Sequence, residues 1–158
     1  MTHHGDHTHS DSEIATLNTL TATLIDSVNG YEDAASNSDS EHFRQLFRDC
    51  ARERNQAVED LRSEIRRLGG NPEDDGSFMG KTHQRFLDLK AAIMGRDEQA
   101  IINEVERGED YLKEKFETAL KGDTLSGEGR TIVEHAYQSV RSGHDKMSAL
   151  KHGMEANS

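Results

Sequence analysis

The helical spacing of apolar residues is the feature that most limits how this chain can fold. Apolar side chains recur every three or four residues in four long segments, which is typical of amphipathic helices. We expect helices over residues 12–35, from a cap at Ser38 to about Leu68, over 98–122 and over 126–150. No segment of five or more residues alternates as a β-strand does. The sequence therefore predicts an all-α protein.

The lengths of the connections indicate how these helices pair. Short turns join the first helix to the second and the third to the fourth, which favours two antiparallel helical hairpins. Residues 69–96 are too many for a tight turn, and within them residues 81–94 have amphipathic spacing. We expect a ferritin-like four-helix bundle whose long crossover contains a short extra helix.

Composition is compatible with one bundle domain that has polar ends. Only 32% of the 158 residues are hydrophobic, which still suffices for one apolar stripe per helix. We expect the bundle over residues 13–152, a disordered tail at 1–12 and a C-terminal tail at 153–158. The first tail contains four histidines that would bind Zn or Ni adventitiously, namely His3, His4, His7 and His9.

Charge and hydropathy exclude several classes of partner. A formal net charge of −11 opposes binding to nucleic acid and to anionic lipid. No apolar run approaches the roughly 20 residues of a membrane span, and the N-terminus lacks the apolar segment of a signal peptide. We therefore expect a cytoplasmic protein with no nucleic-acid or membrane partner. Phe78, Phe86 or Met94 would cover the bundle or contact a protein partner or a second copy of the chain.

Two glutamates fall on the apolar sides of their helices. The stretches IDSVNGYEDAA, residues 25–35, and INEVERGEDYL, residues 102–112, align without gaps and superpose Glu32 on Glu109. At about 100° per residue, both glutamates project into the apolar arc. A buried carboxylate is costly unless it is paired, protonated or bound to a metal. Two interpretations follow.

In the structural interpretation, the glutamates pair with Arg54, which lies near the centre of the apolar arc of its helix, or with the hydroxyls of Tyr31 and Tyr137. Glu53, beside Arg54, is taken as a second buried polar residue of this helix. Such groups fix the register of packed helices at some cost in stability.

In the metal interpretation, Glu32, Glu109 and His144 form a degenerate site for iron, manganese or zinc. The helical rise of about 1.5 Å per residue places the three at similar heights, provided that the crossover returns the chain to the end of the first turn. A divalent metal ion would then be the cofactor.

The chain resembles a bacterial family of ferritin-like four-helix-bundle proteins of unknown function. The matching stretches lie between residues 17 and 150 and are LNTL, NGYEDAA, RLGGNPEDDGSFMGKTHQRFLDLKAAI, ERGEDYLKEKFETALK and HDKMSALK. The resemblance implies a ferritin-like bundle in the bacterial cytoplasm with no established activity. It also implies an association with stress.

The ferritin-like di-iron site requires one Glu from each of two helices and Glu-x-x-His from each of the other two. Glu32 and Glu109 fit the two single-glutamate roles. Residues 53–56 offer Gln where the histidine is required, and the fourth helix has no Glu-x-x-His. We therefore do not expect a standard di-iron centre.

No nucleophile–base set, Gly-rich phosphate loop or Cys-x-x-Cys pair accompanies these residues. We expect a non-catalytic, stress-associated structural or interaction protein, with no catalytic residue assigned. The alternative is a divergent metal-binding bundle that uses Glu32, Glu109 and His144.

Overall fold

The computed structural model describes residues 4–72, 89, 91–95 and 97–156, and the side chains among them from residue 11 to 153. It has four long helices: α1 (His4–Asn37), α2 (Glu41–Arg67), α4 (Glu98–Lys121) and α5 (Gly127–Ala156). The label α3 belongs to a short helix in the crossover, of which residues 89 and 91–94 are described. The protein is all-α, as predicted.

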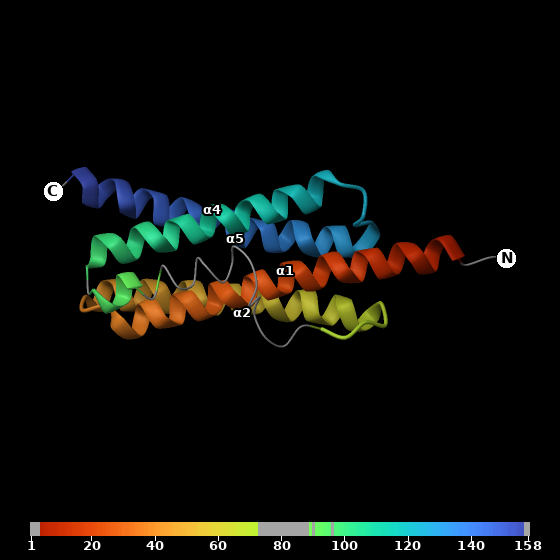
Figure 1. Cartoon of the computed structure of the whole chain (residues 1–158), viewed down its shortest axis with the longest axis horizontal. Helices are drawn as coiled ribbons and strands as arrows, with labels where there is room; N and C mark the ends of the chain where they lie inside the picture. Colours follow the sequence, from red (N-terminus) through yellow and green to blue (C-terminus); the bar gives the residue numbers. More distant parts are fainter. Residues whose placement is uncertain (1–3, 73–88, 90, 96, 157–158) are drawn as a thin grey trace.

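The four helices pack as two antiparallel hairpins, α1 with α2 and α4 with α5 (Figure 1). The hairpins join through the pairs α1–α4 and α2–α5, so the helices occupy the corners of a square. The crossover brings α4 back to the end where α1 turns into α2. There the backbone N–H of Ser40 donates to the carboxylate of Glu98 over 3.3 Å. The predicted bundle of two hairpins with a long crossover is confirmed.

Local hydrogen bonds fix where the helices begin and end. Asp97 caps α4 by accepting from the backbone N–H groups of its first turn, so the helix begins at residue 98, as predicted. The cap of α2 is Ser40 and not the predicted Ser38, whose hydroxyl instead donates to the carbonyl of Ala34. At the other end of α2, Gly69 adopts a φ of 89°, which favours glycine, and the chain leaves the helix there.

The helices reach further than the sequence pattern suggested. α1 begins at His4, so the segment expected to be a disordered tail is helical from that residue onward. α5 continues to Ala156, into the predicted C-terminal tail. His3, Phe78 and Phe86 lie outside the described residues, as do the side chains of the other tail histidines. Met94 is 83% exposed.

Core-facing positions recur every seven residues, as in other bundles whose helices pack at shallow angles. Most of these positions hold apolar side chains, including Leu17, Leu24, Phe47, Leu61, Ile102, Phe116 and Ala136. The same seven-residue series places Arg54 between Phe47 and Leu61, and Glu109 between Ile102 and Phe116. Two ionised side chains therefore occupy the middle of the core. None of the described helices combines the length and apolar character needed to cross a membrane.

Candidate functional site

The centre of the bundle contains a buried ion pair between α2 and α4. Nη1 of Arg54 donates to Oε1 of Glu109 over 2.7 Å, and Nη2 donates to Oε2 over 2.6 Å. Only 2% of the Arg54 side chain and 3% of the Glu109 side chain are exposed. This two-bond geometry is the strongest form of arginine–carboxylate pairing, and it occupies both oxygens of the glutamate.

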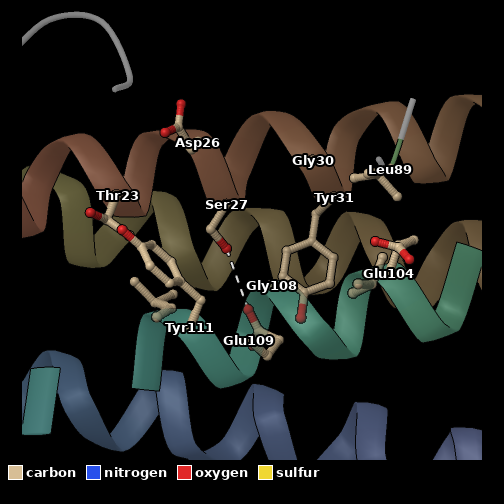
Figure 2. A pocket seen from close by; sticks show the side chains of 12 residues that line it. Thr23, Asp26, Ser27, Gly30, Tyr31, Leu89, Glu104, Gly108, Glu109 and Tyr111 are labelled. Carbon is tan, nitrogen blue, oxygen red and sulfur yellow. Dashed lines mark hydrogen bonds between the residues drawn. The ribbon is translucent and has the colours of Figure 1, made fainter. Parts of the chain in front are cut away.

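Two residues of α1 complete the surroundings of the pair. The Ser27 hydroxyl accepts a 2.5 Å hydrogen bond from Nη1 of Arg54. It donates to Oε1 of Glu109 over 3.5 Å, a bond drawn as a dashed line in Figure 2. The ring of Tyr31 points from α1 towards α4 (Figure 2). The guanidinium carbon of Arg54 lies 5.5 Å from the centre of that ring, within the range of a cation–π contact.

The fourth helix contributes a glycine. A Cβ atom on Gly143 of α5 would lie 2.5 Å from both Nη2 of Arg54 and Oε2 of Glu109. The absence of a side chain at this position therefore gives the ion pair the space that it occupies. We call Ser27, Tyr31, Arg54, Glu109 and Gly143 the Arg54 layer, to which each of the four long helices contributes.

Burial and the charge of Glu109 shift the pKa values of Arg54 and Tyr31 in the layer and of Cys50 beside it. Burial opposes the charge on Arg54, but the Glu109 carboxylate outweighs it and raises the pKa of the guanidinium above its ordinary value. Burial raises the pKa of Tyr31 well above 10.0, and the charge of Glu109 raises it further. The same two causes raise the pKa of the buried Cys50 thiol. Tyr31 and Cys50 are therefore neutral at neutral pH, and neither resembles an activated nucleophile or base.

A cavity of about 70 Å³ lies beside the layer, between α1 and α4. Its walls are mainly apolar and include Tyr31, Leu89 and Gly108 (Figure 2). The hydroxyl of Tyr31 finds no hydrogen-bond partner among the described residues. The volume suits about two water molecules, whereas pockets for organic ligands measure roughly 300 Å³ or more.

The structure separates the residues that were predicted to bind a metal. Glu109 pairs with Arg54, as the structural interpretation expected. Glu32 is exposed, so its predicted position on the inner side of α1 is wrong. His144 lies at the edge of α5, where its Nε2 contacts Asp110 over 2.5 Å. Glu32, Glu109 and His144 therefore do not meet.

Two further predicted contacts differ in the structure. Glu53 is exposed and lies 3.9 Å from the ammonium group of Lys146, so its predicted burial is wrong. Tyr137 donates a 2.6 Å hydrogen bond to Glu117 rather than to either predicted glutamate. Both differences place polar groups at the rim of the bundle, where water can solvate them.

Ser27 and Gly143 are two residues of the layer that were not predicted from the sequence. Gly143 stands in the seven-residue series that runs from Gly129 through Ala136 to Leu150, and a glycine at a core-facing position signals a close neighbour. Ser27 lies seven residues after the core residue Leu20. The period of seven is the signal that would have found both.

A second buried polar layer lies near the N-terminal end of α5. Its acids, Glu13 and Glu64, are 4% and 2% exposed. Arg67 forms two 2.7 Å hydrogen bonds with Glu64. Glu13 accepts from the backbone N–H of Ser126, just before α5 begins, where the helix dipole favours a negative charge. A Cβ atom on Gly129 would overlap Glu13, so here too a glycine of α5 makes room for a buried acid.

Three potential metal ligands gather at the surface between α4 and α5. One carboxylate oxygen from each of Glu106 and Asp110 and a ring nitrogen of His144 lie within 4.8 Å of one another. Glu106 and Asp110 are four residues apart on α4 and therefore share a face. Among the described residues, Glu106, Asp110 and His144 are the three potential ligands that lie this close together. The group shares only His144 with the predicted site.

Comparison with known proteins identifies the family but no activity. No curated protein matches the sequence. The family model described as Domain of unknown function (DUF2383) matches residues 12–122, which include α2, α4 and most of α1. Because this match covers more than half of the chain, the protein belongs to the DUF2383 family.

Proposed function

We propose that this chain is a non-catalytic helical bundle that acts as a structural or interaction protein. The observation that carries the proposal is the complete pairing of Glu109. Both of its oxygens accept from Arg54 inside a layer to which all four long helices contribute. A carboxylate held in this way fixes the register of the helices, and both of its oxygens are engaged by a guanidinium rather than by a metal ion.

The surroundings of the pair support the same conclusion. The adjoining cavity is too small for an organic substrate or cofactor, and the neighbouring tyrosine and thiol are neutral at neutral pH. The ferritin-like character of the bundle is also part of the proposal. The two hairpins and the long crossover support this ferritin-like character. A di-iron centre is not part of the proposal, because Arg54 occupies a core position at which such a centre would need a metal ligand.

The setting of the protein is proposed to be the bacterial cytoplasm under stress, as the family resemblance implies. In this setting its partner would be another protein or a second copy of the chain. Light scattering on the full chain at several concentrations tests the second possibility, since a dimer would double the mass of 17.7 kDa.

Metal analysis of the full chain tests the role of Glu109. The four tail histidines are first replaced by glutamine, and the protein is loaded with iron, manganese or zinc. We expect Glu109→Gln to leave the metal content per chain unchanged and to lower the stability, because Arg54 would then be a buried charge without a counter-ion. Loss of bound metal in a Glu109→Gln variant that circular dichroism shows to be folded, while Asp110→Asn keeps its metal, would show that Glu109 is a ligand and would refute the proposal.

A further inference from the structure

We propose that Glu106, Asp110 and His144 form a binding site for a divalent transition-metal ion, with Zn²⁺ as the best-suited example. The site joins α4 to α5 at the surface and is separate from the buried Arg54 layer. Nitrogen and oxygen ligands of this kind suit zinc and its neighbours in the first transition row. Three protein ligands leave a fourth position for water.

The spacing of the ligand atoms fits a tetrahedral ion. Zinc lies about 2.0–2.2 Å from its nitrogen and oxygen ligands, so two ligand atoms of a tetrahedral set are about 3.4 Å apart. Nε2 of His144 and Oδ1 of Asp110 are 2.5 Å apart, and all three ligand atoms lie within 4.8 Å of one another. The separation of about 3.4 Å that a tetrahedral ion requires lies between 2.5 Å and 4.8 Å. The side chain of Asp110 is 55% exposed and can rotate to reach it.

The histidine is already oriented for ligation. Its Nδ1 lies 3.3 Å from a carboxylate oxygen of Asp145, and its Nε2 faces Asp110. The 2.5 Å contact requires a proton between Nε2 and Asp110, and a metal ion would displace that proton, as metal binding at histidine generally does. The remaining proton on Nδ1 is then donated to Asp145, leaving the lone pair of Nε2 on the side of Asp110. Metal-binding histidines commonly have this arrangement, in which a carboxylate holds the ring nitrogen opposite the metal.

The local charge also favours a divalent cation. Glu106, Asp110 and Asp145 bring three carboxylates together, and Lys151 brings one ammonium group, which lies 3.3 Å from Oε1 of Glu106. Lys151 therefore holds one oxygen of Glu106, and its positive charge competes with the ion for this carboxylate. Removing Lys151 should therefore strengthen metal binding. If Lys151 served only to hold α5 against α4, its removal would not raise the affinity for the metal.

Zinc titration of the full chain tests the site. All variants carry glutamine at His3, His4, His7 and His9, so that the N-terminal histidines do not contribute. ZnCl₂ is titrated by calorimetry, and CoCl₂ serves as a spectroscopic probe because tetrahedral Co²⁺ absorbs strongly in the visible range. We expect one Zn²⁺ per chain. Asp110→Asn and His144→Gln should each weaken binding by at least about tenfold.

Two further variants make the test specific. His135→Gln removes an exposed histidine from the same helix outside the cluster and should leave zinc affinity unchanged. Lys151→Gln should raise the affinity several-fold. Circular dichroism establishes that each variant is folded. The proposal is overturned if the parent binds no Zn²⁺ at micromolar concentrations, or if folded Asp110→Asn and His144→Gln both bind it as the parent does.

Discussion

A Cβ atom on Gly143 of α5 would lie 2.5 Å from Nη2 of Arg54, a separation that real Cβ atoms essentially never show. The guanidinium cannot move away easily, because it is buried and donates two hydrogen bonds to Glu109. The glycine and the ion pair are therefore parts of one arrangement. Gly129 stands in the same relation to Glu13 two heptads earlier on α5.

We predict that Gly143→Ala lowers the free energy of unfolding by about 1–3 kcal/mol, the usual cost of overpacking a core. The better helix propensity of alanine, worth about 1 kcal/mol, acts in the opposite direction and is already included in this expectation. Urea unfolding followed by circular dichroism measures the change. Gly108→Ala is the matched control, because among the described residues no atom outside its own helical turn lies within 4 Å of the added Cβ. That variant should gain about 0.5–1 kcal/mol. Equal effects of the two substitutions would contradict the account.

The alkaline behaviour of the protein should depend on Tyr31. Its folded-state pKa is raised well above the ordinary value of 10.0, first by burial and then by Glu109. The unfolded chain loses this proton near pH 10 while the folded chain keeps it. The contribution of Tyr31 to stability is therefore complete below pH 10 and is lost as the pH rises further. The loss amounts to about 1.4 kcal/mol per pH unit for one proton.

Tyr31→Phe removes this dependence and also removes a hydroxyl that lacks a hydrogen-bond partner among the described residues. We expect its stability at neutral pH to stay within about 1 kcal/mol of the parent, since both rings fill the same space. Urea unfolding between about pH 8 and pH 11 should show a shallower alkaline decline in the variant. Identical slopes in the two proteins would show that Tyr31 ionises normally in the folded state.

Substitution of Glu32 should cost much less stability than substitution of Glu109, although the alignment of residues 25–35 with 102–112 superposes the two. Glu32 is exposed, so Glu32→Ala should change the unfolding free energy by no more than about 0.5 kcal/mol. Thermal unfolding of this variant gives a quick comparison with the parent. A large destabilisation would place Glu32 inside the core and restore the repeat-based prediction.

The fold was predictable because helical spacing and the lengths of connections are local properties of the sequence. The predicted end of the second helix near Leu68 and the predicted start of the third at residue 98 agree with the turn at Gly69 and the cap Asp97. The short turns indicated which helices pair as hairpins. The pattern was weakest at the ends of α1 and α5. The segments that extend these helices are polar, so no apolar period marked them as helical.

The candidate site was only partly predictable, because helical spacing does not say how wide the buried face of a helix is. Glu109 lies in the same seven-residue series as the buried Ile102 and Phe116. Glu32 follows Ile25 by seven residues, and Ile25 is only half-buried, so this series lies at the edge of the core. The partners of a buried charge come from other helices. The convergence of Ser27 and Gly143 on Arg54 therefore follows only from the packed bundle.

The central claim is that the Arg54–Glu109 pair is structural, and a double-mutant cycle tests it most directly. Urea unfolding is measured for the parent, Arg54→Met, Glu109→Leu and the double variant. We predict a loss of about 3–5 kcal/mol in each single variant, because each leaves one buried charge unpaired. The double variant should recover most of this loss, since it replaces the pair with apolar side chains of similar size. Single variants as stable as the parent, or a double variant whose loss equals the sum of the two, would contradict the account.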